Sequence, residues 1–367
     1  MPTFYVIFMI CSSPRRTRRS QSNFLVCLRA LCALCGEVVL RIEAQEEVWP
    51  LKEPFRISRG SRTEARVVVV TVSDAQYTGR GEGVPIRRYN QTCASVIAQI
   101  ESIQSVRDLD RDKLQPRKRS GLPPGAARNA LDCALWDLGA KRSGKRVWEL
   151  ANIPIVPEVE TSFTISLDTP ERMAASAKAN SNRPILKLKL GGDKLDLQRV
   201  EAVREAAPAS RLLIDANESW SPEHYRKIVP TLKELGVELI EQPFPADADE
   251  VLETLDHQVP VCADESCHTT VDLPRLNNRY EAINVKLDKT GGLTEALSLC
   301  ERARESGFKL LIGCMVGTSL GMAPARLLAS AADYVDLDGP LLLARDRDHG
   351  LSYQNGKIGM PARDLWG

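Results

Sequence analysis

The segment "ILKLKLGG", residues Ile185–Gly192, decides how the rest of the chain is to be interpreted. Side chains alternate sides along a β-strand, so Lys187 and Lys189 would share one face and the leucines the other. Taken alone, this alternation is typical of a half-exposed strand with a solvated lysine face. The alternative is a strand covered on both faces, in which buried charges need partners. The surrounding sequence distinguishes the two interpretations.

Around this segment, from about residue 160 onward, apolar strands alternate with amphipathic helical segments. Two of these helices have good starts, because Thr169 and Ser221 can act as N-caps and each is followed by Pro at the first helical position. Repeated βα units of this length imply a parallel sheet, and eight of them imply a closed barrel. The eight expected strands are "TSFTISL", "ILKLKL", "RLLIDAN", "VELIEQP", "PVCADES", "AINVKLD", "KLLIGCM" and "YVDLDGP", with seven helical connections.

The sequence before the repeats has strands first and helices afterwards, which is an α+β pattern. The expected strands are "VVLRIEAQEEV" and "ARVVVVTVSD", followed by a turn at residues 79–83 and helices at "CASVIAQIESI" and "GAARNALDCALWDLGAKRSG". We therefore expect an α+β domain at residues 37–155 and the barrel at 156–342. The turn-rich segment 343–367 is expected to return to the N-terminal domain.

Residues 1–36 differ from the rest, because they contain five arginines and no acidic residue. We interpret them as a disordered or non-native upstream extension, with a transit peptide as the alternative. The net charge of +1 and the lack of a long apolar run argue against nucleic-acid and membrane partners. The later cysteines are scattered singly, as in a cytoplasmic protein with reduced thiols. A homo-oligomer is compatible with the sequence.

Charged residues stand at the ends of the apolar barrel strands, where barrel enzymes carry their catalytic side chains. Successive spacings from Lys189 are 26, 26, 23 and 22 residues, or one charge per repeat. Three carboxylates on neighbouring strands form an all-oxygen site that suits Mg²⁺ and disfavours zinc. A buried salt-bridge network of lysines and acids is the structural alternative. The residues are Lys187, Lys189, Asp215, Glu241, Asp264, Lys286, Asp336 and Asp338.

These lysines and acids, with the run "KLDKTGG" that begins at Lys286, resemble the muconate-lactonising branch of the enolase superfamily. The resemblance covers nearly the whole chain after residue 37 and implies an α+β capping domain over a modified TIM barrel. It also implies that the three acids hold Mg²⁺ while Lys189 and Lys286 move protons on opposite faces of a carbon next to a carboxylate, through an enediolate. Because the base must be neutral, the charge of Lys187 and the metal should lower the pKa of Lys189.

Within that branch the chain is most similar to L-Ala-D/L-Glu dipeptide epimerases. The resemblance implies that Asp336 and Asp338 bind the dipeptide's ammonium group and that Arg59 binds the side-chain carboxylate of its C-terminal Glu. Arg56 and Arg62 are alternatives to Arg59 in the loop "PFRISRGSRTEA". A second capping loop, residues 79–90, offers Arg87, Arg88 and Tyr89. Further expected substrate contacts are Lys187, Thr164, Cys314 and Met315.

The sequence thus predicts a Mg²⁺-dependent isomerase that inverts the α-carbon of the C-terminal residue of L-Ala-Glu-like dipeptides, as in murein peptide turnover. Three alternatives stay open. Another enzyme of the same branch would share the metal and lysines: an N-acylamino acid racemase, an o-succinylbenzoate synthase or a cycloisomerase. A Schiff-base aldolase would use a barrel lysine without the three acids. A barrel that only binds small peptides would keep the same residues without turnover.

Overall fold

The computed structural model describes residues 40–103, 109–110, 115–116 and 122–367. The expected N-terminal extension, residues 1–36, lies outside the described residues. The chain divides into one unit up to Leu40 and a second from Arg41 to Gly367, and the second unit contains the helices and strands described. No helix in the described ranges is both long and apolar enough to cross a membrane.

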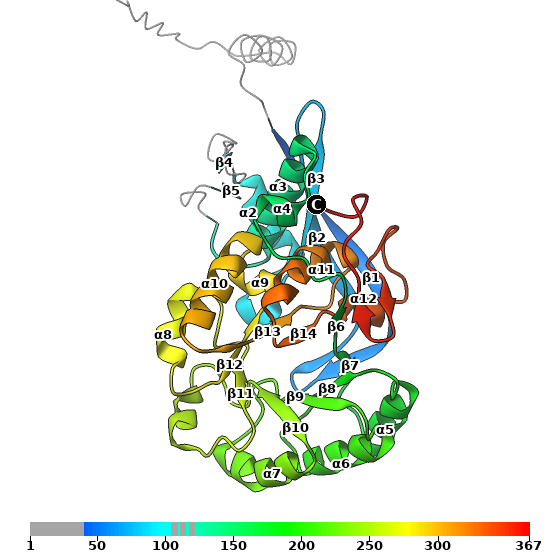
Figure 1. The fold of residues 1–367 in the computed structure, drawn as a ribbon, viewed down its shortest axis with the longest axis vertical. Coiled ribbons are helices and arrows are strands. Elements are labelled where there is room, and N and C mark those ends of the chain that lie inside the picture. Colours follow the sequence, from blue (N-terminus) through cyan, green and yellow to red (C-terminus); the bar gives the residue numbers. More distant parts are fainter. Residues whose placement is uncertain (1–39, 104–108, 111–114, 117–121) are drawn as a thin grey trace, which may run out of the picture. The chain divides into compact units, whose positions relative to one another are not determined.

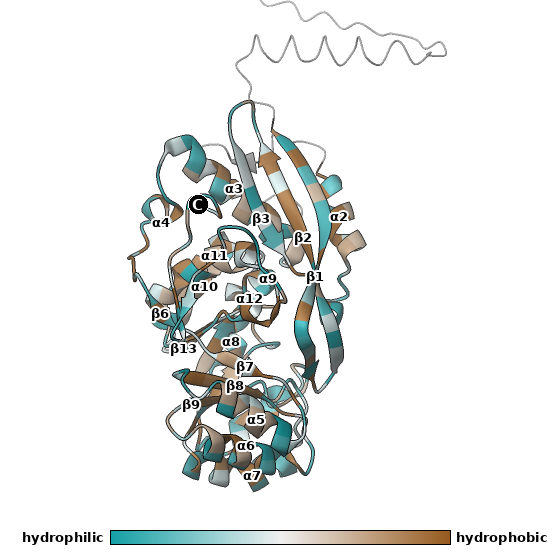
Figure 2. Cartoon of the chain, turned by 90° about the vertical axis from the view of Figure 1, so that its right-hand side faces the viewer, coloured by the Kyte–Doolittle hydropathy of each residue, from teal (hydrophilic) through white to brown (hydrophobic). Residues whose placement is uncertain are grey.

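The N-terminal domain is built on an antiparallel sheet in the order β1-β2-β3 (Figure 2). The central strand carries a run of valines that the neighbouring elements bury completely or almost so, which agrees with the preference of β-branched residues for a covered sheet. The register between β1 and β2 shifts between Pro50 and Phe55, where a bulge lets the hairpin continue toward the barrel. The strands are β1 Arg41–Ile57, β2 Gly60–Ser73 and β3 Thr78–Gly83.

The turn expected at residues 79–83 is wrong, because this segment is strand β3. Its glycines are there for packing: a Cβ on Gly79, Gly81 or Gly83 would lie 2.1–2.2 Å from a backbone oxygen of helix α3. The strand and the helix therefore approach more closely than any side chain would allow. Both expected helices are present, as α2 Cys93–Glu101 and α3 Ala126–Ser143. The other elements here are η1 Arg87–Tyr89, β4 Leu109–Asp110, β5 Gln115–Pro116, α4 Val147–Leu150 and β6 Val159–Glu160.

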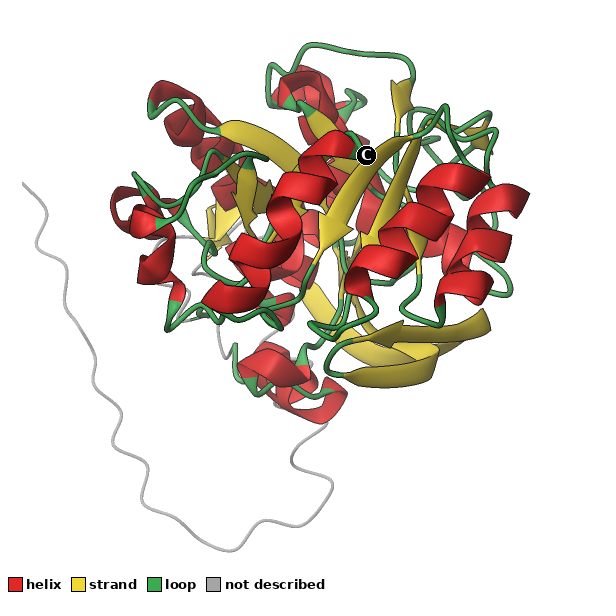
Figure 3. Ribbon diagram, turned by 90° about the horizontal axis from the view of Figure 1, so that it is seen from below, coloured by secondary structure: helices red, strands yellow, loops and turns green. Residues whose placement is uncertain are grey.

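All eight expected barrel strands are present and pair in parallel in chain order, from β7 to β14. The first and last strands also meet, since the Ser162 amide donates to the Val335 carbonyl at 2.9 Å, so the barrel is close to closed. Helices cover the outside of the strands (Figures 1 and 3). The strands are β7 Phe163–Ile165, β8 Ile185–Lys189, β9 Arg211–Asp215, β10 Val237–Glu241, β11 Val261–Ala263, β12 Ala282–Val285, β13 Lys309–Gly313 and β14 Tyr334–Asp336.

The barrel connections are less regular than expected. After β10 and β11, where full helices were predicted, the chain forms 3₁₀ turns and one short helix. Thr169 and Ser221 cap their helices as predicted, each accepting a hydrogen bond from the third helical amide. The connections are α5 Pro170–Ala179, α6 Asp196–Ala206, α7 Pro222–Glu234, η3 Asp249–Thr254, η4 Thr270–Asp272, α8 Leu273–Leu276, α9 Leu287–Thr290, α10 Leu293–Glu305, α11 Ser319–Leu327, η5 Leu328–Ala331 and α12 Gly339–Leu342.

The C-terminal segment contacts strand β6, just before the barrel, and helix α3 of the N-terminal domain. Strands β15 Tyr353–Gln354 and β16 Lys357–Ile358 form a small antiparallel sheet with β6. The last two residues reach α3, where the Trp366 indole donates to the Cys133 carbonyl and the Gly367 amide donates to Asp137. The segment therefore connects the end of the barrel to the N-terminal domain.

Candidate active site

The barrel interior changes character along each strand. At the amino-terminal ends, one residue from each of seven strands joins an apolar cluster, which we call the barrel floor: Ile185, Leu213, Leu239, Cys262, Ala282, Leu311 and Tyr334. Two positions further along, which the period of a strand places on the same face, six of the seven strands carry a charged or polar side chain, and the seventh has Gly313. All five residues of β8 are buried, with Lys187 1% and Lys189 8% exposed. The interpretation of a solvated lysine face is therefore wrong.

Asp215, Glu241 and Asp264 end neighbouring strands and converge in this interior. Each offers a carboxylate oxygen, and the three oxygens lie within 4.8 Å of one another. Two groups from the β12 region hold the acids in place. The Asn284 amide donates to Glu241 Oε1 at 2.7 Å, and Lys289 Nζ donates to Asp264 Oδ1 at 2.7 Å.

Lys289 was not predicted as a site residue. Its Nζ also donates to the carbonyl oxygens of Asp264 and Asn284, so all three of its protons have acceptors. The only sequence signal was its place in the "KLDKTGG" run. Lys289 thus fixes Asp264 rather than facing the centre of the barrel.

The other three lysines face the acids directly. Lys187 Nζ lies 2.6 Å from Glu241 and 2.7 Å from Asp336. Burial would lower the pKa of Lys187, but Asp336, Glu241 and Asp215 raise it well above its ordinary value, so Lys187 is a fixed positive charge. Lys189 Nζ lies 2.5 Å from Asp215 on the same side.

Lys286 comes from the other side of the barrel, directly after β12, and its Nζ lies 2.7 Å from Asp264. Burial would lower the pKa of Lys286, but Asp264 and Glu241 raise it. Strands β8 and β12 are four positions apart in the ring of eight. Lys189 and Lys286 therefore approach the acid cluster from opposite sides.

The acid cluster fits a divalent cation. Burial and the charge of Asp215 raise the pKa of Glu241 to about 7, against the lowering effect of Lys187. Glu241 Oε2 is buried and, although it lies close to Lys187 Nζ, no donor is aligned with it for a hydrogen bond. Hard carboxylate oxygens at this spacing suit Mg²⁺ or a similar ion. Ion pairing with the lysines alone leaves this oxygen without an aligned donor.

The two other predicted acids, Asp336 and Asp338, come from the eighth strand and the residues just after it. They have different neighbours in the structure. Asp336 pairs with Lys187 and accepts a hydrogen bond from the Ser162 hydroxyl. Asp338, just beyond β14, accepts from the Thr164 amide at 2.6 Å. Burial and the neighbouring Asp336 raise the pKa of Asp338 to about 6. Asp338 is therefore the acid of the pair that lacks a cationic partner among the described residues.

Cys314 and Met315, the remaining expected contacts, directly follow β13 and are half-buried. Asp338 and Asp336 add to the effect of burial in raising the pKa of the Cys314 thiol, which places this thiol near the eighth strand.

The arginines of the β1–β2 hairpin differ in their protein partners. Arg59 is tied to protein acids, with Nη1 3.0 Å from Glu218 and Nη2 2.6 Å from Glu265. Arg56 pairs with Asp168 at 2.5 Å. Arg62 forms no ion pair with any described carboxylate.

Arg62 lies on the barrel side of the hairpin. Its guanidinium carbon is 5.4 Å from the centre of the Phe55 ring, whose centre is 6.0 Å from Lys189 Nζ. Arg62 is an exposed residue of the hairpin, so its guanidinium is accessible from solvent. Phe55 and the acids Glu218 and Glu265 were not predicted from the sequence.

The second capping loop also contacts the barrel. Tyr89 packs edge-on against His268, with ring centres 4.6 Å apart. Burial and the charges of Asp264 and Glu265 raise the pKa of Tyr89. Arg88 binds Glu218, whereas Arg87 forms no ion pair with a carboxylate in the described part of the chain.

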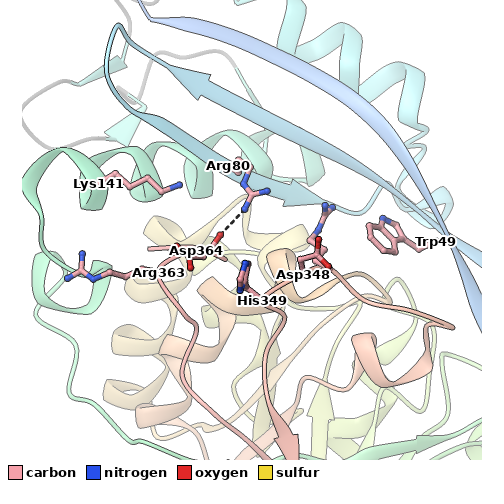
Figure 4. Close-up of a pocket in the computed structure, with 8 residues that line it drawn as sticks. Trp49, Arg80, Lys141, Asp348, His349, Arg363 and Asp364 are labelled. Carbon is pink, nitrogen blue, oxygen red and sulfur yellow. Dashed lines mark hydrogen bonds between the residues drawn. The ribbon is translucent and has the colours of Figure 1, made fainter.

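A hollow of about 600 Å³ lies away from the acid cluster, between β1, β3, α3 and the C-terminal segment (Figure 4). Its basic side chains are already engaged: Lys141 with Asp137, Arg347 with two glutamates, and Arg80 with backbone carbonyls. It contains none of the predicted site residues. We regard it as part of the junction that holds the C-terminal segment.

Two family models match the chain. Residues 40–151 match the mandelate racemase/muconate lactonizing enzyme N-terminal domain, and residues 171–363 match the enolase C-terminal domain-like family. Together with the barrel and its acid cluster, this shows that the chain belongs to the mandelate racemase/muconate lactonizing enzyme branch of the enolase superfamily. The prediction of an α/β barrel with an N-terminal α+β domain is confirmed.

The similar proteins narrow the class to epimerases and racemases. The L-Ala-D/L-Glu epimerase of Escherichia coli (strain K12) is 46% identical over 321 residues, covering 86% of this chain and 98% of that protein. The N-acetyl-D-glutamate racemase of Pseudoalteromonas sp. is 45% identical over 302 residues, covering 82% and 95%. The chain is thus an isomerase, as predicted.

Solved structures agree with this class. An enolase family member from Agrobacterium tumefaciens with homology to dipeptide epimerases, crystallised with sodium and L-Ala-L-Glu, has a TM-score of 0.86 and 47% identity, covering 90% of this chain and all of that one. The dipeptide epimerase of Cytophaga hutchinsonii, complexed with Mg and D-Ala-L-Val, has a TM-score of 0.81 and 28% identity, covering 88% and 93%.

Proposed function

We propose that this protein is a Mg²⁺-dependent dipeptide epimerase that inverts the α-carbon of the C-terminal residue of L-Ala-Glu-like substrates. The observation that carries the proposal is the placement of Lys189 and Lys286 on opposite sides of one acid cluster. Inversion needs one group that removes a proton from one face of the carbon and another that returns a proton to the other face. The high identity to an L-Ala-D/L-Glu epimerase supports the same activity.

Asp215, Glu241 and Asp264 are the residues that would hold Mg²⁺. When bound, the ion supplies positive charge beside the substrate carboxylate as its negative charge grows. Asn284 and Lys289 keep two of the carboxylates oriented toward the centre. Lys187, held by Glu241 and Asp336, adds a fixed positive charge on the same side as Lys189.

Lys189 and Lys286 carry the proton transfers. The neutral amine of one lysine takes the α-proton, and the electron pair of the C–H bond becomes the C=C bond of an enediolate. The ammonium of the other lysine then protonates the opposite face and restores the carboxylate. The roles exchange for the reverse reaction, so each lysine must be neutral for one epimer and charged for the other. The neutral state of Lys189 stays a prediction.

Substrate recognition is proposed at the two ends of the dipeptide. Asp338, with no cationic partner among the described residues, would accept the substrate ammonium, with Thr164 holding its other side. Asp336 would contribute through Lys187. Arg62, rather than the engaged Arg59, would bind the side-chain carboxylate of the C-terminal residue. Cys314 and Met315 would line the site between them. The source of the dipeptide in murein turnover stays a prediction.

A second candidate is racemisation of N-acylated glutamate, which the 45% identity to an N-acetyl-D-glutamate racemase favours. Such a substrate has the same carboxylates but no ammonium. The two functions therefore differ in whether Asp338 faces a cation. A carboxylate without a counter-charge beside a neutral acyl group would be costly, which favours the dipeptide.

The test is deuterium incorporation in D₂O with Mg²⁺, using L-Ala-L-Glu, L-Ala-L-Gln and N-acetyl-L-Glu in parallel. We expect one deuterium at the C-terminal α-carbon of L-Ala-L-Glu and the appearance of L-Ala-D-Glu. Faster exchange with N-acetyl-L-Glu would select the racemase. If borohydride inactivates the protein in the presence of substrate, the protein forms an imine and is an aldolase. If a panel of dipeptides binds without exchange of the α-proton, the protein is a barrel that only binds small peptides.

A further inference from the structure

Two segments of the N-terminal domain reach the carboxyl end of the barrel. One is the tip of the β1–β2 hairpin, with Ser58 and Arg59, and the other is η1 with Arg88. Both meet the turn formed by Asn217 and Glu218, a few residues after the acid Asp215 of β9. One short turn of the barrel is thus the shared contact of both capping segments.

Glu218 accepts hydrogen bonds on both carboxylate oxygens. Arg88 holds it with two nitrogens, Nε to Oε2 at 2.9 Å and Nη2 to Oε1 at 3.0 Å. Arg59 Nη1 adds a bond to Oε2 at 3.0 Å, and the Ala246 amide adds one to Oε1 at 2.9 Å. The Glu218 side chain is 7% exposed. A two-pronged arginine–carboxylate pair is geometrically specific, and burial protects it from solvent screening.

The backbone conformation of this turn is unusual. Asn217 has φ 45° and Glu218 has φ 64°, in the left-handed region that side chains other than Asn, Asp and Gly rarely adopt. The Glu218 amide donates to the Gln242 carbonyl at 2.8 Å, which holds the turn against the next strand end. A strained conformation that persists beside a site requires support from its surroundings. Here it directs the Glu218 carboxylate toward the capping segments.

Arg59 extends the connection to a second strand end. Its Nη1 also donates to the Asn217 carbonyl at 2.8 Å, and its Nη2 donates to Glu265 at 2.6 Å. Glu265 directly follows the acid Asp264. Arg59 therefore spans the turns after two of the three strands that carry the acid cluster, and both ends of its guanidinium are occupied by protein oxygens.

We propose that Glu218 is a positioning residue that fastens both capping segments to the barrel mouth, with Arg59 and Arg88 as its structural partners rather than substrate ligands. Fastening the hairpin at Arg59 leaves Arg62, three residues on, as the guanidinium that packs against Phe55, the ring that also lies next to Lys189. The substrate part of this inference rests on the proposed function. The structural part, that one carboxylate holds both segments, does not depend on it.

The structural part can be tested by limited trypsin digestion of the folded full chain, with the cut bonds mapped by mass spectrometry. The Glu218→Gln variant keeps every trypsin site, including those after Arg59, Arg62, Arg87 and Arg88. We expect cleavage at these bonds to accelerate about tenfold or more, since the lost charge weakens several charge-assisted hydrogen bonds at once. Unchanged cleavage at these bonds in a folded Glu218→Gln protein would overturn the inference.

Two further variants guard against a general loss of folding. Glu46→Gln removes an ion pair with Arg66 inside the N-terminal sheet and should leave the cleavage pattern unchanged. Arg88→Met removes a half-exposed side chain and frees η1 alone, because Arg59 keeps Glu265. Cleavage after Arg87 should then rise more than cleavage after Arg59. Equal rises at both bonds, or none, would contradict the two-armed connection.

Kinetics separate this inference from the proposed function. Glu218→Gln should raise KM about tenfold for both L-Ala-L-Glu and the neutral L-Ala-L-Gln, because both segments lose their position. Loss of Arg62 should affect only the acidic substrate. If the wild-type protein turns over neither dipeptide, the proposed function fails while the digestion result still decides the role of Glu218. A Glu218→Gln effect confined to L-Ala-L-Glu would instead make Glu218 part of the side-chain site.

Discussion

The two ends of the barrel interior are made by the same strands, yet they have opposite properties. The floor is an apolar cluster with one residue from each of seven strands, whereas the mouth holds lysines and acids two to four residues further along the chain. The floor gains stability by removing apolar surface from water. The mouth keeps buried charges, which are tolerable because its lysines and acids pair with one another. This barrel thus separates stability from chemistry by a shift of two to four residues along the chain.

The largest effect is expected at the mouth. Replacing Lys286 with Ala should lower epimerisation by at least about 10³-fold, as for loss of a general acid–base group. Because Lys189 still faces the other side, one epimer should continue to exchange its α-proton in D₂O. NMR of both epimers in D₂O measures this directly. Equal loss of exchange from both epimers would argue against two bases that each act on one face.

A change at the floor should act on stability instead. Leu239→Ala removes a buried side chain from the cluster and should reduce the free energy of unfolding by about 3 kcal/mol. KM and kcat of the folded variant should stay close to those of the wild type. Urea unfolding and steady-state kinetics on the same preparation check both halves. A large kinetic effect with normal stability would break the separation between floor and mouth.

The charged strand ends of the mouth could be predicted because surface chance rarely places a charge at the same end of six out of eight apolar βα repeats. The partners of those charges could not. Glu218 lies 159 residues from Arg59 and Glu265 lies 206 residues away, so nothing local in the sequence indicated that Arg59 is engaged. Lys289 was hidden for a similar reason, since its role depends on where Asp264 ends the neighbouring strand.

The glycines of the N-terminal domain were harder to interpret from the sequence. Gly79, Gly81 and Gly83 are spaced as in a turn, but they alternate along β3 because helix α3 leaves no room for a Cβ. Glycine is required both where two elements pack closely and where the chain makes a tight turn. The alternation at every second position was the signal that favoured a strand, and it becomes decisive only once α3 is known to cover that face.

A smaller effect is expected at the edge of the mouth. Arg62→Met should raise KM for L-Ala-L-Glu by about 10- to 100-fold, as for removal of a charged hydrogen-bonding partner, and leave L-Ala-L-Gln nearly unchanged. Arg59→Met should not discriminate between the two substrates. Steady-state kinetics with the matched pair of dipeptides tests this. If Arg59→Met shows the selective loss instead, the side-chain carboxylate binds where the sequence resemblance placed it.

The smallest expected effect is the change in the free energy of unfolding per pH unit that is caused by Asp288. This buried acid belongs neither to the floor nor to the mouth of the barrel. Asp288 accepts hydrogen bonds from the Val84 amide and the Asn129 side chain, both at 2.8 Å, and burial raises its pKa to about 7. The folded state therefore holds a proton here that the unfolded state releases near its ordinary value. As the pH rises from about 4 to 7, this group should cost stability by up to about 1.4 kcal/mol per pH unit, and the cost should level off above the folded pKa.

Asp288→Asn imitates the protonated acid and should remove this contribution. The difference in unfolding free energy between variant and wild type, measured in urea across this range, should therefore change in favour of the variant as the pH rises. A difference that does not vary with pH would mean that Asp288 is already ionised in the folded protein. It would then extend the charged character of the mouth into the junction with the N-terminal domain and weaken the division between floor and mouth.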